Sequence, residues 1–467
     1  MDIAMVGLGV MGRNLVLNMA DHGFSVVGYD RDESKVAALK QEGAGKKVEA
    51  VSNPDDLVAK LTKPRAVMML VPAGKPVDSV IRDMLPRLAA GDFLIDGGNS
   101  HFTDTDLRAK TLADKGLQFI GVGISGGEQG ARHGPSMMPG GDPKSYERVR
   151  PIFEACAAKV GGEPCVAHLG PGSAGHYVKM VHNGIEYGLM QLISETYALM
   201  KLGLGLSDDE LHEVYDEWNR GELSSFLLEI TANIFRQVDD KTGKRLVDVI
   251  LDAAKQKGTG MWTSQDAMSL QVPTPTIDIA VSMRDLSSIK SERQTASRVL
   301  RGPSQKLAKD RTTFVKQLRG ALYASMVLTY AQGMSQLRRA SEAYGYGLDP
   351  ETVARIWRGG CIIRAALLED IRRAFKTKPD LSNLLLDRSL GEAVMKRQDD
   401  LRAVCCAAAE AGIAAPGMMV SLGYFDGYHS EWLPANLIQA QRDCFGAHTY
   451  ERVDEKGTFH TEWRVSE

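Results

Sequence analysis

The first thirty residues constrain the fold of this chain most strongly. An apolar run, Ile3–Val6, leads into Gly7-Leu8-Gly9-Val10-Met11-Gly12; a helical pattern follows from Asn14 to Ala20, and a second apolar run ends at Asp30. A strand, a G-x-G-x-x-G turn and a helix in this order are typical of the first unit of a dinucleotide-binding sheet. There Gly7 allows the tight turn, Gly9 lets the backbone approach a pyrophosphate, and Gly12 lets helix and strand pack closely. A purely structural glycine-rich turn is the alternative.

Proline divides the chain into two parts. Eleven of the 18 prolines lie at or before Pro171, and none lies between positions 172 and 272. Before that point short apolar runs alternate with helical segments; after Ile3–Val6 they are Ser25–Tyr29, Ala66–Val71, Phe93–Ile95 and Gln118–Val122. This alternation predicts a parallel sheet with right-handed crossovers. The long apolar-periodic stretches beyond residue 175 predict helices.

The helical part contains a faint internal repeat. Gly203-Leu204-Gly205-Leu206, Trp218 and Leu227-Leu228-Glu229 recur in the same order as Gly345-Tyr346-Gly347-Leu348, Trp357 and Leu367-Leu368-Glu369. The offset drifts between roughly 139 and 145 residues, and the repeat favours two related helical halves packed as one domain. The segment from Pro434 is polar and aromatic with little periodicity, so we expect an extended tail that lies on another surface.

The fold class expected from these patterns is α/β, with a Rossmann-type N-terminal domain, followed by a large all-α duplicated domain and a C-terminal tail. The expected boundaries are 1–174, 175–433 and 434–467.

Composition excludes several classes of partner. Lys and Arg total 56 against 59 Asp and Glu, a net charge of −3, so no basic field is available for nucleic acid or an acidic membrane. The chain has neither the basic, then apolar start of a signal peptide nor a charge-free apolar run of ~18 residues, so we expect no membrane span. Six cysteines without a CxxC pair indicate a reduced, cytoplasmic protein.

The charges after the second apolar run bear on the choice of cofactor. Asp30 lies 18 residues after Gly12, where a carboxylate can hold the two ribose hydroxyls of NAD and repel a 2′-phosphate. Arg31 could instead pair with the 2′-phosphate of NADP, whereas Asp32 adds a second negative charge. Two carboxylates against one guanidinium favour NAD. A solvated turn of mixed charge is the alternative.

The segment Gly175–Tyr187 is the most informative stretch. Lys179, His182, Asn183 and Glu186 are spaced i, i+3, i+4, i+7, which places them on one helical face. A solvated face would normally repeat Lys and Glu in i,i+4 pairs. A shift of 145 residues gives uncharged counterparts in the second repeat: Ala324, Val327, Leu328 and Ala331. A shift of 143 residues also gives uncharged residues: Leu322, Ser325, Met326 and Thr329.

A duplicated fold therefore does not itself require these polar groups, and a functional site is favoured over a solvated face. Burial can lower the pKa of a lysine and raise that of a glutamate. Lys179 and Glu186 would then supply a base and an acid at one pH.

Two glycine-rich segments follow predicted strands. Asp96-Gly97-Gly98-Asn99-Ser100 and Ser125-Gly126-Gly127-Glu128-Gln129-Gly130 would lie at the carboxyl ends of parallel strands, where ligands bind. Structural glycine turns are the alternative. Lys257, Arg284 and the tail residues Arg442 and His448 are isolated cationic or titratable groups that on their own indicate only surface. No His, Cys or Asp cluster has metal-ligand spacing, so no metal is expected.

Taken together, these residues closely resemble the 6-phosphogluconate dehydrogenase (decarboxylating) family of the pentose phosphate pathway. The resemblance runs nearly end to end. It includes Gly7–Gly12, Asp96–Asn99, Gly123–Glu128, Gly175–Tyr187, Lys257–Gly260 and Leu433–Tyr450.

The resemblance implies oxidative decarboxylation of 6-phosphogluconate to ribulose 5-phosphate and CO2, with reduction of a nicotinamide cofactor and no metal. Lys179 would be the general base that takes the proton of the 3-hydroxyl, and Glu186 the acid that protonates C1. The implied substrate contacts are Asn99, Ser125, Gly126, Gly127, His182, Asn183, Tyr187, Lys257, Arg284, Arg442 and His448. Among these, Tyr187, Lys257 and Arg284 would contact the phosphate. Arg442 and His448 would come from the partner's tail, which implies a homodimer with tail exchange.

The cofactor contacts expected from the fingerprint and the resemblance lie in four segments: Gly7, Leu8, Gly9, Val10, Met11 and Gly12; Asp30, Arg31 and Asp32; Val71, Pro72 and Ala73; and Asn99. Two of these segments depart from the family pattern. NADP-using members carry Asn-Arg-Thr at positions 30–32 and usually a lysine at position 72. The aspartates and Pro72 oppose or remove positive charge, so we expect NAD or dual use.

Two other functions are compatible with parts of the sequence. A 3-hydroxyacid dehydrogenase acting on a small unphosphorylated acid would share the glycine-rich start and a catalytic lysine, but it would lack the duplicated helical part and the basic tail. A non-catalytic nucleotide-binding protein would have no need of both Lys179 and Glu186.

Overall fold

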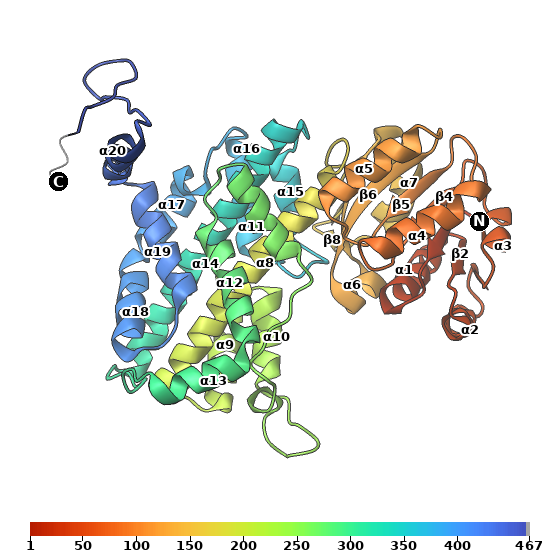
Figure 1. Ribbon diagram of the computed structural model, residues 1–467. Helices are drawn as coiled ribbons and strands as arrows, with labels where there is room; N and C mark the ends of the chain where they lie inside the picture. The colour runs from red at the N-terminus through yellow and green to blue at the C-terminus, as the bar shows by residue number, and fades with distance from the viewer. Residues whose placement is uncertain (464–467) are drawn as a thin grey trace. The chain divides into compact units, whose positions relative to one another are not determined.

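The computed structural model of the protein describes residues 1–463. The chain forms two compact units, residues 1–421 and the segment from Leu422 onward. In the first unit a sheet with its covering helices precedes a helical part (Figure 1). This confirms the expected fold class, whereas the expected boundaries at 174 and 433 stay predictions.

The sheet has seven strands in the order β3-β2-β1-β4-β5-β6-β7, all parallel except β7. The strands are β1 (Ile3–Val6), β2 (Val26–Tyr29), β3 (Val48–Val51), β4 (Ala66–Met69), β5 (Phe93–Asp96), β6 (Gln118–Ser125) and β7 (Ser136–Gly141). The connecting helices are α1 (Val10–Asp21), α2 (Glu33–Glu42), α3 (Pro54–Ala59), α4 (Lys75–Met84), the 3-10 turn Leu85–Arg87, α5 (Phe102–Ala113), α6 (Gly127–His133) and α7 (Pro143–Cys156).

Both faces of the sheet are buried, as the uninterrupted apolar runs predict. Along β1, Ile3 and Met5 join one apolar cluster, and Ala4 and Val6 join the other. Helices α1 and α7 supply the first cluster, while α3, α4 and α5 supply the second. The strand order reverses between β1 and β4, so a crevice is expected where these two strands end.

The sequence patterns missed two edge strands. Strand β3 is only partly buried, and its short sequence Val-Glu-Ala-Val is interrupted by a charged residue. Strand β7, Ser-Met-Met-Pro-Gly-Gly, pairs antiparallel with β6 and is fully buried, yet proline and two glycines hide its strand character. Strand β6 also runs on to Ser125, three residues beyond the predicted end.

A short hairpin leads from the sheet to the helices. It consists of β8 (Lys159–Val160) and β9 (Glu163–Pro164). The helices are α8 (Ala174–Ala198), a π-helical segment (Leu199–Leu204), α9 (Asp208–Asn219), α10 (Phe226–Ile234), the 3-10 turn Leu246–Asp248, α11 (Thr259–Ser269), α12 (Pro275–Ser288), α13 (Lys290–Val299), α14 (Arg311–Tyr344), α15 (Pro350–Ile356), α16 (Leu367–Thr377), the 3-10 turn Leu384–Leu386, α17 (Arg388–Met395) and α18 (Gln398–Ala411). A further helix, α19 (Pro416–Tyr428), spans the division between the two units.

Helix α8 joins the sheet to the helical part. Its first turns pack on β6 and β7, and further along it packs on α11, α12 and α14 (Figure 1). Glycines make the approach to the sheet possible: a Cβ atom on Gly175 would lie 2.1 Å from the carbonyl oxygen of Met138, and one on Gly123 would lie 2.3 Å from Cβ of Lys179. The sheet therefore fixes the position of Lys179.

The arrangement of the helices supports the predicted duplication. In each half a long helix (α8 or α14) is followed by a left-handed glycine, a helix with a buried tryptophan next to its last residue (Trp218 or Trp357), and another helix. An isolated bridge joins Ser225 to Ala365, positions 140 residues apart, close to the offset of the repeat. A nearly equivalent pair of residues thus meets where the two halves touch.

The structure of the second unit corrects the expectation of an extended tail. The segment contains a helix, α20 (Ala435–Gly446), and an isolated bridge between Tyr450 and Phe459. The apolar residues of α20 are exposed, Leu437 and Ile438 at 60% each. Because these side chains face no core of their own, the usual amphipathic signal for a helix is weak. Within residues 1–463, no helix combines the length and apolarity needed to cross a membrane.

Candidate active site

The glycine-rich turn lies at the crevice where β1 and β4 end. Gly7 has a φ of +98°, and a Cβ atom there would meet the carbonyl oxygen of Leu70 at 2.6 Å. A Cβ atom on Gly12 would lie 2.0 Å from the carbonyl oxygen of Gly7. Gly9, by contrast, caps α1 with open space around it, and no side chain caps the helix. The free N–H groups and the open approach at Gly9 suit a pyrophosphate.

A cavity of about 390 Å³ continues from this turn. Residues of three of the predicted cofactor segments line it: Gly7, Asp30, Arg31, Val71 and Pro72. An adenosine moiety could occupy this cavity, because it is lined largely by apolar groups with a few charged ones at its rim. The residues present therefore fit a dinucleotide.

The charges at the rim are more numerous than the sequence motif suggested. The carboxylate of Asp30 accepts the backbone N–H groups of Leu8 (2.8 Å) and Asp32 (3.0 Å). Asp32 caps α2, and Lys35 lies 3.7 Å from both aspartates.

Arg31 forms an ion pair with Asp83, which also lines the cavity. Lys35 and Asp83 were missed; the helical i,i+3 spacing of Lys35 from Asp32 could have identified the lysine. Three carboxylates now face two cations, so the net charge of the rim is still negative.

The two glycine-rich segments meet beside the sheet. Asn99, in the left-handed region with a φ of +53°, exchanges two hydrogen bonds with the backbone of Ile124, at 2.9 and 3.1 Å. Ser125, which ends β6, and Gly126 follow directly. Gly126 and Gly127 have φ values of +115° and +59°, so this turn requires glycine at both positions. Asn99 is thereby tied to the turn that begins at Ser125.

Lys179 lies at the centre of a buried polar network on α8. Its Nζ donates to Oδ1 of Asn183 at 2.7 Å and lies 3.2 Å from Nδ1 of His182. The other ring nitrogen of His182 lies 3.3 Å from Oγ of Ser125, and the amide of Asn183 donates to Thr259 at the start of α11 at 3.1 Å. The helical face predicted from spacing therefore joins the sheet, α8 and α11.

The ionisation properties of this face suit proton transfer. Burial lowers the pKa of Lys179 to about 8, and burial together with the charge of Lys179 holds the pKa of His182 well below its ordinary value. Burial raises the pKa of Glu186, although the positive charge of Lys179 opposes the shift. Near physiological pH these shifts increase the fraction of Lys179 that is a neutral amine and the fraction of Glu186 that is a neutral carboxylic acid.

Two of the predicted phosphate contacts, Tyr187 and Arg284, meet at the far end of the face. The guanidinium of Arg284 lies 3.3 Å from the ring centroid of the buried Tyr187. A Cβ atom on Gly260 would lie 2.4 Å from the same ring, so α11 packs directly on Tyr187. Lys257 is exposed, two residues before α11 begins.

Arg442 and His448 lie in the second unit, on α20 and just beyond it. Between them Asp443 is fully buried and accepts hydrogen bonds from the backbone of Thr449 and Thr461 and from the side chains of His460 and Trp463, at 2.8–3.0 Å. Burial acts to raise the pKa of Asp443, but these hydrogen bonds outweigh it and lower the pKa. Asp443 therefore organises the segment that carries both predicted substrate residues.

Sequence patterns also missed a loop from the second half. Trp357 packs its ring against His182, with centroids 5.6 Å apart, and the backbone N–H of Ile362 donates to Oγ of Ser125 at 3.4 Å. Some 175 residues separate Trp357 from His182, and no periodicity connects them. Across residues 1–463 there is no group of three or more His, Cys, Asp or Glu side chains that could hold a metal ion.

Two family models match most of the chain. The family model described as the NAD binding domain of 6-phosphogluconate dehydrogenase matches residues 2–170, and the one described as the C-terminal domain of 6-phosphogluconate dehydrogenase matches residues 175–463.

Two relatives and one solved structure match nearly the whole chain. The Bacillus subtilis NADP(+)-dependent, decarboxylating 6-phosphogluconate dehydrogenase is 52% identical over 99% of both chains. The Saccharomyces cerevisiae decarboxylating 6-phosphogluconate dehydrogenase 2 is 50% identical over 98% of this chain and 94% of its own. The Plasmodium falciparum 6-phosphogluconate dehydrogenase, solved apo and with NADP+ or 6-phosphogluconate, is 42% identical over 99% of this chain and 100% of that one, with a TM-score of 0.93.

A nucleotide-binding crevice beside a buried lysine face, together with family matches that cover almost every residue, leads to one assignment: the chain belongs to the 6-phosphogluconate dehydrogenase family.

Proposed function

We propose that the protein oxidises and decarboxylates 6-phosphogluconate to ribulose 5-phosphate and CO2, with reduction of a nicotinamide cofactor. The observation that carries the proposal is the environment of Lys179: a buried amine, tied to Asn183 and His182, with a pKa lowered to about 8. The full-length relatives named for this reaction support it. They do not favour a 3-hydroxyacid dehydrogenase for small acids or a non-catalytic binding protein.

Lys179 acts as the general base in this proposal. In its neutral form Nζ accepts the proton of the 3-hydroxyl of the sugar acid, while Asn183 and His182 hold the amine in place. The bound cofactor supplies the hydride acceptor. The resulting 3-keto acid loses its carboxylate readily, and the ammonium form of Lys179 stabilises the negative charge that develops on the 3-oxygen.

Glu186 acts as the general acid. Seven residues at ~1.5 Å per residue place it about 10 Å from Lys179 along the axis of α8, so the two groups can address different carbons of one sugar. A raised pKa favours the protonated carboxyl, which can donate to C1 of the enediol. The sugar carboxylate would lie at Ser125, Gly126 and Gly127, with Asn99 beside it. The phosphate would lie near Tyr187, Lys257 and Arg284.

The direct test is a steady-state assay with purified protein. CO2 release and cofactor reduction should be stoichiometric with 6-phosphogluconate, and 3-hydroxyisobutyrate should give no turnover. Turnover of 3-hydroxyisobutyrate alone would favour the small-acid dehydrogenase. Cofactor binding without CO2 release would favour a binding protein.

For the cofactor we infer NAD or dual use. The support is the net negative rim of Asp30, Asp32 and Asp83 against Arg31 and Lys35, which disfavours a 2′-phosphate. Asp30→Asn with Asp32→Thr keeps an acceptor for the N–H of Leu8 and a capping hydroxyl for α2. This pair should raise kcat/KM for NADP relative to NAD by about tenfold, the equivalent of one charge interaction of ~1.4 kcal/mol. An unchanged ratio would contradict the charge argument.

We also infer a homodimer in which each tail completes the partner's site. The support is the exposure of Leu437, Ile438 and Phe445 in the segment that carries Arg442 and His448. Mixed dimers test this: Lys179→Met subunits combined with Arg442→Met subunits would have one intact site if tails are exchanged, and none if each tail serves its own subunit. Recovered activity supports exchange, and inactive mixed dimers contradict it.

A further inference from the structure

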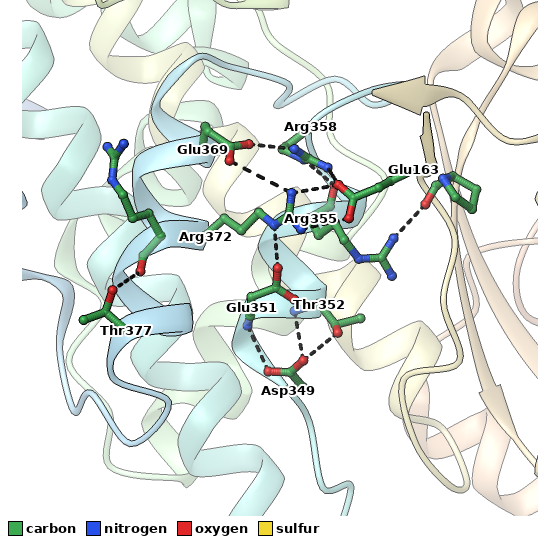
Figure 2. A network of polar contacts seen from close by, with 11 residues as sticks. Glu163, Asp349, Glu351, Thr352, Arg355, Arg358, Glu369, Arg372 and Thr377 are labelled. Atoms are coloured by element: carbon green, nitrogen blue, oxygen red, sulfur yellow. Dashed lines mark hydrogen bonds and ion pairs between the residues drawn. The ribbon is translucent and has the colours of Figure 1, made fainter. Parts of the chain in front are cut away.

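A network of ion pairs joins the sheet-side hairpin to the second helical half. Glu163 on β9 accepts hydrogen bonds from both terminal nitrogens of Arg372 on α16, at 2.7 and 2.9 Å. It accepts a third from Nη2 of Arg358 at 2.5 Å (Figure 2). Arg358 also donates to Glu369 at 2.6 Å, and Arg372 to Glu351. We call Glu163, Arg358 and Arg372 the Glu163 clasp.

The two arginines of the clasp are less exposed than those of a typical surface ion pair, and Glu163 is 41% exposed. The Arg358 and Arg372 side chains are only 9% and 16% exposed, and the contact of Arg372 with Glu163 is bidentate. Hydrogen bonds from Arg372 and Arg358 lower the pKa of Glu163 to about 2, so the clasp keeps its charges throughout the pH range of an assay. Arg355 adds a hydrogen bond to the carbonyl of Pro164 at 2.9 Å (Figure 2).

Arg358 lies within the loop that reaches the candidate active site. Residues 357–362, called the 357–362 loop, follow α15 and pass between the β8–β9 hairpin and the Ser125–Gly126 turn. On the hairpin side, a Cβ atom on Gly359 would lie 2.8 Å from Val160 and 3.3 Å from Cys165, which leaves no room to move in that direction.

On the other side the loop touches Ser125 and Gly126, which the proposed function assigns to the sugar acid, and His182, which holds Lys179. The carbonyl oxygen of Gly360 lies 2.5 Å from where a Cβ atom of Gly126 would be, and it accepts the N–H of Ser136 at 2.7 Å. Ile362 donates its N–H to Ser125, and Trp357 packs on His182. The loop thus contacts Ser125, Gly126 and His182 directly and limits their movement.

We propose that the Glu163 clasp is a positioning device that holds the 357–362 loop against the Ser125–Gly126 turn and so sets the geometry of the sugar-acid subsite. Its three residues are not among those that the proposed function assigns to the substrate or the cofactor. The inference rests on the proposed function, because it assigns the subsite to a sugar acid. A displaced loop would misorient the hydroxyl of Ser125 and the ring of His182, whereas the nucleotide crevice at Gly7–Gly12 would be unaffected.

The test compares neighbouring arginines on α16. Arg372→Met and Glu163→Gln remove the clasp, and Arg373→Met removes only an exposed ion pair with Asp370 on the same helix. We expect the clasp variants to raise KM for 6-phosphogluconate roughly tenfold and, because His182 holds Lys179, to lower kcat as well, with KM for the cofactor within about twofold of wild type. A KM for 6-phosphogluconate no higher than that of Arg373→Met, or an equal rise in both KM values, would overturn the proposal.

Two further measurements keep the test decisive. Should Arg372→Met or Glu163→Gln fail to fold, Arg372→Lys retains the charge but loses the bidentate geometry, and it should show the same KM split at a smaller size. Hydrogen exchange without any sugar acid should be faster at Ser136 and Ile362 in Arg372→Met than in Arg373→Met. This readout separates failure of the clasp from failure of the proposed function, since it needs no substrate; equal exchange would contradict the clasp.

Discussion

The first helices of the two related halves, α8 and α14, differ in one respect. Helix α8 carries polar residues at positions where α14 has uncharged ones. On α8, Lys179, His182 and the neighbouring Asn183 form a hydrogen-bonded set within the interior. On α14 the counterparts by either repeat offset are uncharged, and all eight of them are buried. Both helices are long, and both form the core of their half.

The comparison separates the effect of the polar face on the free energy of unfolding from its role in catalysis. An apolar α14 provides the same packing without desolvating a charge, so packing does not require Lys179. A buried lysine whose pKa falls from 10.5 to about 8 destabilises the folded state at pH 7 by about 3 kcal/mol. Chemistry is the remaining reason for the residue, and the following predictions test that conclusion.

Replacing Lys179 with methionine should produce the largest effect. Turnover of 6-phosphogluconate should fall by at least about 10³-fold, because methionine cannot accept the proton of the 3-hydroxyl. The free energy of unfolding at pH 7 should rise by about 1–3 kcal/mol, because a buried charge is removed. Denaturant unfolding and steady-state kinetics on the same sample check both parts. Full activity, or loss of stability together with loss of activity, would break the comparison.

Replacing Glu186 with glutamine should lower kcat about 10²-fold. The glutamine keeps the size of the side chain but cannot donate the proton that C1 requires. In the pH profile of kcat/KM, the limb that falls at high pH should disappear, while the rising limb that depends on Lys179 should remain. A profile with both limbs unchanged would assign the acid elsewhere.

A lysine placed on α14 tests whether the interior of the second half tolerates a buried charge. Leu322 on α14 is fully buried, and a 143-residue shift makes it the counterpart of Lys179. Leu322→Lys should lower the free energy of unfolding by about 3 kcal/mol or more, whereas the matched Leu322→Met should cost less than about 1.5 kcal/mol. Neither variant should change kcat of the folded protein. A Leu322→Lys protein as stable as Leu322→Met would show that the interior tolerates such charges without a functional reason.

The pH dependence should give the smallest effect. The base must be neutral, so kcat/KM should rise with pH as Lys179 loses its proton near pH 8, by about tenfold between pH 7 and pH 9 if the acid limb is removed by Glu186→Gln. The stability contribution has the same sign: the unfolded lysine binds its proton up to about pH 10.5, so the penalty is relieved as pH rises from 8 to 10.5. A midpoint near 10 for the rising limb would place Lys179 in a more hydrated environment than this structure gives it.

Local sequence was sufficient to predict a structural feature wherever consecutive residues carry its pattern. The strand, glycine turn and helix at Ile3–Ala20 predicted the Rossmann-type part, and the spacing from Lys179 to Glu186 predicted one helical face, because periods of 2 and 3.6 residues have a direct geometric meaning. Where periodicity was absent, prediction failed. Strand β7 was hidden by proline and glycine, and α20 by apolar residues that face no core of their own.

The amino-acid sequence by itself determined the class of fold, the family and the chemical groups placed on α8. Only the tertiary structure decided their environment. It buried Lys179 against Gly123, placed the Trp357 loop behind Ser125 and His182, and set Lys35 and Asp83 beside Asp30. The physical reason is that pKa values and side-chain orientation depend on desolvation and on neighbours distant in the chain. Those neighbours leave no periodic signal in the sequence.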